Sequence, residues 1–178
     1  ALRDQNRVLA LVAGTGVNSD GRTTGIALPN QKAQIQLMEE VYQRFGLNKT
    51  KLVYMEAHGT GTAAGDPLEA GAIGTVFGKA LKGTRPLYVG SVKSNIGHLE
   101  PASGMAGLLK SLLVLNNNKI PPNLHLKTPN PAIDFKELNI RVPQGVTALP
   151  KTGGDELISI NSFGFGGTNA HVVLQRAA

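Results

Sequence analysis

The sequence predicts an α/β fold built around a mixed β-sheet. Over the first two thirds of the chain, short apolar runs typical of strands alternate with helical patterns, and two further strands then follow one another directly. The length of 178 residues corresponds to one domain or to part of a larger one. A chain of this size can bury about 70% of its unfolded surface, which is enough for a hydrophobic core.

Two strands and one helix are predicted at the start of the chain. Residues 8–13 form an apolar run that ends in a glycine turn at residues 14–16, a pattern typical of a strand buried on both faces. A second strand is expected at residues 52–55. Between them, apolar residues recur at three- and four-residue spacing, which predicts a helix that ends at Gly46. The apolar positions of this helix are Ile35, Met38, Val41, Tyr42 and Phe45.

A second helix is predicted to begin near Asp66, which we expect to cap it, with Pro67 in its first turn. A third strand follows at residues 87–92. Residues 102–115 are rich in Ala, Gly and Leu and predict a helix that is apolar nearly all round, so we expect a central position for it. The expected buried stripe of the second helix is Leu68, Ala72, Ile73, Val76 and Phe77.

The last third of the chain is expected to be irregular at first and then to form two strands. Residues 116–152 contain most of the prolines and predict irregular surface chain. Strands are predicted at residues 157–160 and 171–174, on either side of a glycine-rich turn at residues 162–168.

Composition excludes several classes of protein. The content of 41% hydrophobic and 17% charged residues argues against intrinsic disorder. No run approaches 18 apolar residues and the first residues are too polar for a signal peptide, so we expect no membrane span and a cytoplasmic location. The absence of cysteine excludes a disulfide framework, a thiolate zinc site and a cysteine nucleophile within this sequence. The net charge of +6 is spread along the chain without interleaved aromatics, which argues against nucleic-acid binding.

Three polar, glycine-containing clusters carry the candidate chemistry. Residues 58–62 begin with a histidine directly after a predicted strand, and residues 93–98 follow the next strand with a lysine and a histidine five positions apart. Residues 161–169 form a glycine-rich turn with two phenylalanines. Open α/β sheets bind ligands at the carboxyl ends of their strands, so these clusters predict a site there.

None of the three clusters fits a phosphate-binding loop or a metal site. Gly59 and Gly61 lack a third glycine at the required offset, and the last cluster has Asn169 where a dinucleotide site needs glycine. Two histidines forty residues apart, without cysteines, do not make a zinc site. We therefore expect no metal.

The order and separation of the clusters resemble the C-terminal half of a β-ketoacyl synthase, the ketosynthase domain of modular polyketide synthases. The resemblance rests on residues 56–67, 90–98 and 161–171, and it extends upstream to residues 16–21. It implies a thiolase-like fold with two similar halves, each a five-stranded mixed sheet with helices on its faces, in an enzyme that is usually dimeric. We therefore interpret residues 1–178 as a single incomplete domain.

The family's reaction gives the chain an expected activity. The resemblance implies a Cys-His-His site in which the cysteine takes an acyl chain from an acyl carrier protein, and a carrier-bound malonyl unit is then decarboxylated and condensed onto it. Substrates would arrive on the 4′-phosphopantetheine of the carrier, with no cofactor bound to this chain. The basic surface is consistent with docking an acidic carrier protein.

Four residues take catalytic roles from the resemblance. His58 and His98 correspond to the two family histidines, Lys93 corresponds to the lysine before the second one, and Glu69 is expected to pair with Lys93. Without the resemblance, each histidine could be structural, Lys93 could be an ordinary solvated lysine, and Glu69 could be a first-turn acid favoured by the helix dipole.

Four more residues are expected to bind substrate. Thr60 and Thr62 resemble the residues that hold the pantetheine arm, and Phe165 resembles the gate over the acyl pocket, although core packing would also explain an aromatic there. Asn95, in the second cluster, is placed with them.

Other polar residues near the clusters have simpler interpretations. Asp20 lies in a turn-like stretch that it could simply shape, and His125 and His171 have no supporting context, so we expect both histidines to be structural.

The nucleophile of the family lies in the N-terminal half, so we expect a separate N-terminal ketosynthase partner that carries the cysteine. The chain is expected to expose an apolar face and to be stable only with that partner, and to be inactive alone. The alternative function is a non-elongating ketosynthase, or a structural subunit that shapes the acyl tunnel. The presence of His58 favours elongation, because non-elongating relatives typically lose that histidine.

Overall fold

A computed structural model describes residues 1, 3–23, 25 and 28–177 of the chain. Its centre is a mixed sheet of six strands in the order β1-β8-β7-β2-β3-β5. β2, β3, β5 and β7 pair in parallel, whereas β8 runs antiparallel to both of its neighbours. The strands are β1 (Leu11–Ser19), β2 (Leu52–Glu56), β3 (Leu87–Gly90), β5 (Ile140–Arg141), β7 (Leu157–Phe163) and β8 (Thr168–Gln175).

The α/β fold and the five long strands confirm the predicted class. The sixth strand, β5, has only two residues and was not predicted, because it lies in the proline-rich segment that we expected to be irregular. The same segment contributes β6 (Thr147–Ala148), which pairs with β4 (Lys119–Ile120) in a separate small ladder.

The first strand differs from the prediction in its bounds and in its surroundings. β1 begins at Leu11 and continues through the glycines that we expected to form a turn. These glycines let the strand approach a helix closely, because a Cβ atom on Gly16 would lie only 2.5 Å from Cγ2 of Val41. β1 also forms the edge of the sheet and exposes Val12 and Val17, so it is not buried on both faces.

Two helices were predicted correctly in position but not in every contact. Asn30 caps α1 (Gln31–Arg44) by accepting hydrogen bonds from the next turn. Of the predicted stripe, Met38, Val41 and Tyr42 are buried, whereas Ile35 is half-buried and Phe45 is exposed. α2 (Gly65–Ile73) continues through a π-helical turn, η2 (Gly74–Gly78), into α3 (Lys79–Leu81). Asp66 does not cap α2, because its carboxylate accepts a hydrogen bond from the Gly61 N–H at 3.0 Å.

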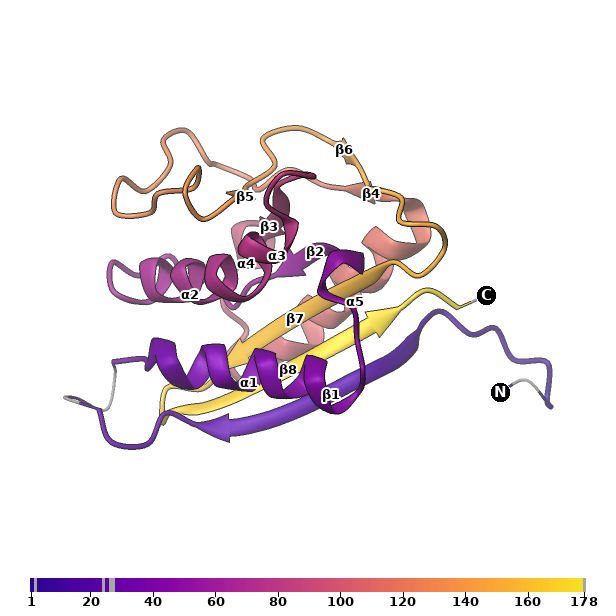
Figure 1. Cartoon of the computed structure of the whole chain (residues 1–178), viewed down its shortest axis with the longest axis horizontal. Coiled ribbons are helices and arrows are strands. Elements are labelled where there is room, and N and C mark those ends of the chain that lie inside the picture. Colours follow the sequence, from indigo (N-terminus) through magenta and orange to yellow (C-terminus); the bar gives the residue numbers. More distant parts are fainter. Residues whose placement is uncertain (2, 24, 26–27, 178) are drawn as a thin grey trace.

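The helices cover both faces of the sheet (Figure 1). α1, α2 and η2 pack on one face in a core that includes Tyr42, Phe77 and Met55. α5 (Ser103–Asn117) packs on the other face, where Val114 and Ile158 belong to a second cluster. Short η1 (Lys49–Lys51), α4 (Lys93–Ile96) and η3 (Glu100–Ala102) complete the described elements.

The last long helix, α5, is apolar on most sides, as expected, but it is only partly buried. Met105, Leu109 and Leu113 are 59%, 54% and 64% exposed, and their four-residue spacing places them on one face of the helix. We call these three residues the α5 face. The α5 face fits the exposed apolar surface that we expect from the sequence.

The sheet topology brings the three clusters together at the carboxyl ends of β2, β3 and β7. β2, β3 and β7 are parallel, so the segments after them emerge at the same end of the sheet. Within the described residues, no helix has the length and apolarity needed to cross a membrane.

Candidate active site

The two histidines of the clusters lie next to each other. The ring centroids of His58 and His98 are 5.4 Å apart and the planes meet at 82°. Phe163, at the end of β7, lies beside His58, with the two ring centroids 5.7 Å apart. Both histidines line one cavity of about 470 Å³, so two imidazoles from different loops face a single ligand space.

The ring of His98 has one nitrogen in a defined role. Its Nδ1 accepts a hydrogen bond from the Glu100 N–H at 2.9 Å. A nitrogen that accepts a hydrogen bond carries no proton, so the neutral ring has its proton on Nε2. Nε2–H is therefore a donor available to a ligand.

His58 is held in the neutral form by its surroundings. Burial, and then the positive charge of Lys93, lower the pKa of His58 to about 4. At neutral pH the ring is therefore an uncharged hydrogen-bonding group. The loop that carries it makes a sharp turn at Gly59, whose φ of 46° and close approach to Ser91 leave no room for a side chain.

Glu69 occupies a different position from the one expected of it. Its buried carboxylate accepts hydrogen bonds from the backbone N–H groups of His58 at 2.8 Å and Gly59 at 2.9 Å, and from the Asn161 amide at 3.0 Å. Burial raises the pKa of Glu69, while these hydrogen bonds oppose the rise. The expected ion pair with Lys93 is not formed within 4.0 Å, so Glu69 fixes the His58 loop instead.

Lys93 lies on the other side of the His58 loop. It lines a second cavity, of about 320 Å³, that shares Thr60 and Glu69 with the first. Burial lowers the pKa of Lys93, and the charges of Glu69, Glu56 and Asp66 partly offset the effect. Lys93 therefore influences His58 through its positive charge and does not line the cavity that the two histidines share.

Three of the four expected substrate-binding residues line the histidine cavity. Thr60 and Thr62 lie with their hydroxyls 3.2 Å apart, and Phe165 is 76% exposed at the cavity wall, so core packing does not explain it. Asn95 is exposed and lines neither of the two cavities described above, so the structure does not bring it to the site.

The remaining candidates have structural surroundings. Asp20 lines the cavity, but its carboxylate accepts a hydrogen bond from Asn169 at 2.7 Å and so joins β1 to β8. His125 is exposed in the loop before β5, and His171 is fully buried.

Sequence reasoning missed a second buried carboxylate, Glu56, at the end of β2. Its two oxygens accept hydrogen bonds from the Val92 N–H at 2.5 Å and the Tyr54 hydroxyl at 2.6 Å, and Lys110 of α5 forms an ion pair with it at 3.0 Å. The signal was its position directly after the strand predicted at residues 52–55, two residues before His58. Through its hydrogen bond from Val92, the residue before Lys93, Glu56 links the end of β2 to the segment that carries Lys93.

Comparison with known proteins gives the chain its family. Residues 9–127 match the β-ketoacyl synthase C-terminal domain, and residues 129–178 match the ketoacyl-synthetase C-terminal extension. This chain belongs to the β-ketoacyl synthase family. Its fold is the C-terminal half of a thiolase-like ketosynthase, as the resemblance implied.

Relatives of this ketosynthase chain include polyketide synthases. It is 54% identical over 175 residues to the hybrid PKS-NRPS synthetase pynA of Aspergillus niger, and 47% identical over 176 residues to a phenolphthiocerol/phthiocerol polyketide synthase of Mycobacterium tuberculosis. These alignments cover 98% and 99% of the chain but only 4% and 9% of the two relatives.

Solved ketosynthases share the fold closely. The ketosynthase from module 6 of the bacillaene synthase of Bacillus subtilis 168 superposes with a TM-score of 0.94 at 36% identity. Ketosynthase twelve of the bacillaene polyketide synthase of Bacillus amyloliquefaciens gives 0.93 at 33% identity. Each comparison covers 99% of this chain and 32% of the solved chain, so the chain spans about a third of their length.

The buried ion pair of this ketosynthase yields a first prediction. Lys110→Met should destabilise the complete domain by about 3–5 kcal/mol, because it leaves the Glu56 carboxylate buried without its cation. The double variant Glu56→Gln/Lys110→Met removes both charges and should regain most of the loss. Urea unfolding measures the free energy of unfolding of the single and the double variant. A double variant less stable than the single one would contradict the explanation.

Stability of the ketosynthase should also fall in acid. Burial lowers the pKa of His171 to about 3, against 6.5 for an ordinary histidine, so below pH 6.5 the unfolded chain binds a proton that the folded chain does not. The contribution is complete above pH 6.5 and declines as pH falls towards 3, with a loss of about 2 kcal/mol at pH 5. His58 acts in the same direction.

The variant His171→Phe should remove the His171 part of this pH dependence. Unfolding midpoints measured between pH 7.5 and pH 5 would show a shallower decline for the variant than for the parent domain. Equal declines would mean that His171 is protonated in the folded state.

Proposed function

We propose that this chain is the C-terminal part of a ketosynthase that condenses an acyl chain with a carrier-bound malonyl unit, with loss of CO₂. The observation that carries the proposal is the neutral histidine pair at one cavity, with the Nε2–H of His98 available as a donor. Two neutral imidazole donors are suited to a developing oxyanion.

The electron flow explains why such donors are needed. Loss of CO₂ from the malonyl thioester breaks the bond between Cα and the carboxylate carbon, and the electron pair stays on the thioester as an enolate. His58 and His98 donate hydrogen bonds to the enolate oxygen. Its carbon then attacks the acyl thioester, a carbon–carbon bond forms and the cysteine leaves as thiolate. One such donor is typically worth about 10²–10³ in rate.

Lys93 and Glu69 support this step without taking part in bond making. The ammonium of Lys93 adds positive potential to the site, which favours a neutral His58 and the negative enolate. Glu69 is a positioning residue, because it holds the backbone of His58 and Gly59. Thr60 and Thr62 would bind the pantetheine arm and Phe165 would border the acyl pocket. Asn95, away from the cavity, is not proposed as a substrate contact.

The sulfur for the proposed reaction would come from a segment outside this sequence, because this sequence contains no cysteine. We propose that an N-terminal ketosynthase half carries it and covers the α5 face, so that residues 1–178 are one incomplete domain. An acyl carrier protein would deliver both substrates on its 4′-phosphopantetheine, and the assembled enzyme would be a dimer. The chain alone would be inactive.

The test is to produce the complete ketosynthase, either by co-expression of this sequence with a ketosynthase N-terminal half that carries the cysteine or by joining the two in one chain. The assay measures ¹⁴CO₂ release from labelled malonyl-carrier protein and, separately, acyl transfer to the cysteine. Condensation with CO₂ release supports the proposal.

A non-elongating ketosynthase or a structural subunit is the second candidate. It predicts acyl transfer without CO₂ release, or neither activity. His58 is neutral and lies next to His98, which favours elongation over this second candidate.

A further inference from the structure

A chain of buried side chains leads from the core of the sheet to the His58 loop. The His171 ring on β8 contacts the Asn161 amide on β7, with Nδ1 and Oδ1 2.7 Å apart. The other end of that amide, Nδ2, donates to the Glu69 carboxylate at 3.0 Å. Glu69 in turn accepts the backbone N–H groups of His58 and Gly59. The path crosses two neighbouring strands and α2 to reach the site.

The direction of every hydrogen bond in this chain is determined. The amide nitrogen of Asn161 must face the carboxylate of Glu69, because the carboxylate only accepts. The amide oxygen therefore faces His171 and can only accept as well. It follows that Nδ1 of His171 carries the proton and donates it.

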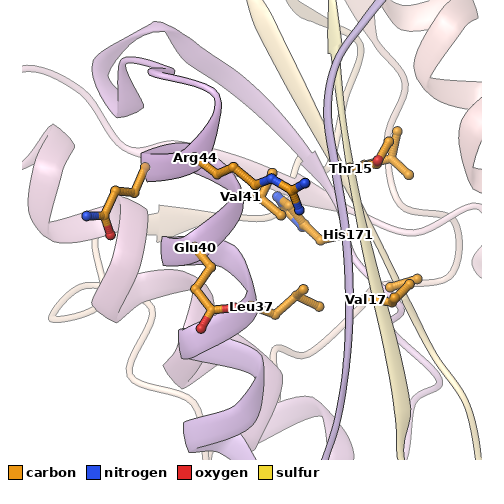
Figure 2. Close-up of a pocket in the computed structure, with 11 residues that line it drawn as sticks. Thr15, Val17, Leu37, Glu40, Val41, Arg44 and His171 are labelled. Atoms are coloured by element: carbon orange, nitrogen blue, oxygen red, sulfur yellow. The ribbon is translucent and has the colours of Figure 1, made fainter.

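The surroundings of His171 keep its ring neutral and in one orientation. The ring is fully buried, lies against Tyr42 and is stacked at 17° with Phe77. Figure 2 shows it between α1 and the strands, beside Val41. Nε2 is buried and has no hydrogen-bond partner within the described residues, so Asn161 is the one group there to which the ring forms a hydrogen bond.

We propose that His171 is a positioning residue for decarboxylation, which acts on His58 through Asn161 and Glu69. Its Nδ1–H prevents the Asn161 amide from turning its oxygen towards Glu69. An amide oxygen against the carboxylate would repel it, and Glu69 would lose its fixed hold on the His58 loop. The inference rests on the proposed role of His58.

The decisive comparison is between two amide substitutions of His171 in the complete ketosynthase. In His171→Asn, the amide branches where Nδ1 does and can still donate to Asn161. In His171→Gln, the amide is one bond further along, near the position of Nε2. Both variants lose the aromatic ring, so a purely structural role would affect them alike.

The readout is the ratio of ¹⁴CO₂ release from malonyl-carrier protein to acyl loading of the cysteine. A loss of folded protein lowers both rates equally, whereas a displaced His58 lowers only CO₂ release. His171→Asn should keep the parent ratio within about threefold, and His171→Gln should lower it about tenfold to a hundredfold, the scale expected for a shift of about 1 Å in a catalytic group.

A double-mutant cycle tests the path. In an Asn161→Ala background, the difference between His171→Asn and His171→Gln should vanish, because the link to Glu69 is gone. Equal ratios for the two variants in the parent background, or an undiminished difference in the Asn161→Ala background, would overturn the proposal. If His171→Gln yields no soluble domain, the isosteric Asn161→Asp replaces it, and an unchanged ratio there would overturn the proposal equally.

His58→Ala in the same assay separates this inference from the proposed function. If His58→Ala releases CO₂ at close to the parent rate, the proposed function fails. If His58→Ala lowers CO₂ release by about 10²-fold or more while His171→Gln matches His171→Asn, the function stands and the role of His171 is wrong.

Discussion

In the complete ketosynthase, His58→Ala and His98→Ala are each expected to lower malonyl decarboxylation by about 10²–10³-fold, the usual value of one oxyanion donor. Both rings line the same cavity and lie 5.4 Å apart, so each can reach one oxygen atom held there. Acyl loading of the cysteine should change by only a few fold, because that step does not form the enolate. Single-turnover assays of the two half-reactions give the two rates.

The double variant should lose less than the product of the two single effects, because the histidines act as a unit on one oxygen. His98→Gln offers a graded test, since its amide can reach the position of Nε2, which carries the donor proton. It should retain more decarboxylation than His98→Ala.

His125 supplies the matched control. It is an exposed histidine outside both cavities, and its φ of 64° suits asparagine, so His125→Asn should keep both rates within about twofold. If His58→Ala and His98→Ala lowered loading and decarboxylation in the same proportion, their effect would be on folding or on the cysteine, and the assignment to the enolate would fail.

The location of the candidate site could be predicted from the clusters, because parallel strands bring the segments that follow them to the same end of the sheet. Strand patterns at residues 52–55 and 87–92, with a polar cluster after each, are sufficient to place His58 and His98 at the same end of the sheet, beyond the carboxyl ends of these strands. The wrong predictions concern glycine and aspartate, whose roles depend on the neighbours. Gly16 continues a strand because Val41 packs against it, and Asp66 bonds to Gly61 rather than capping a helix.

The supporting network could not be predicted, because its central contact joins two distant segments of the sequence. Asn161 and His171 are paired across the hairpin of β7 and β8, whereas Asn161 lies 92 residues from Glu69. Each looks ordinary alone, and only the order of β8 beside β7 and β7 beside β2 brings them together. The Glu56–Lys110 pair was missed for the same reason, since α5 appeared to need only apolar residues.

The second large effect is expected at the α5 face. Leu113→Glu should prevent stable association of this chain with an N-terminal ketosynthase half. A leucine buried by the partner contributes about 1.5–3 kcal/mol, and a buried carboxylate without a partner costs more than that. A total loss of about 3 kcal/mol or more lowers the association constant by over a hundredfold. Co-purification of the two halves, expressed as separate chains, measures it.

Val146→Glu is the control, because Val146 is 70% exposed, similar to Leu113 at 64%, but lies in the loop before β6 rather than on α5. It should leave association unchanged. If Leu113→Glu and Val146→Glu changed the association equally, the partner would cover both positions or neither. The proposal that it binds specifically to the α5 face would then be wrong. If Leu113→Glu instead abolished only pairing between two copies of this chain, the occupant of the face would be a second copy.

Assembly and catalysis should be lost together in Leu113→Glu. α5 packs its opposite side against β7 and follows the loop of His98, so a partner on the α5 face would lie beside the histidine cavity. The surface that holds the two halves together would then also bring the cysteine to the imidazoles.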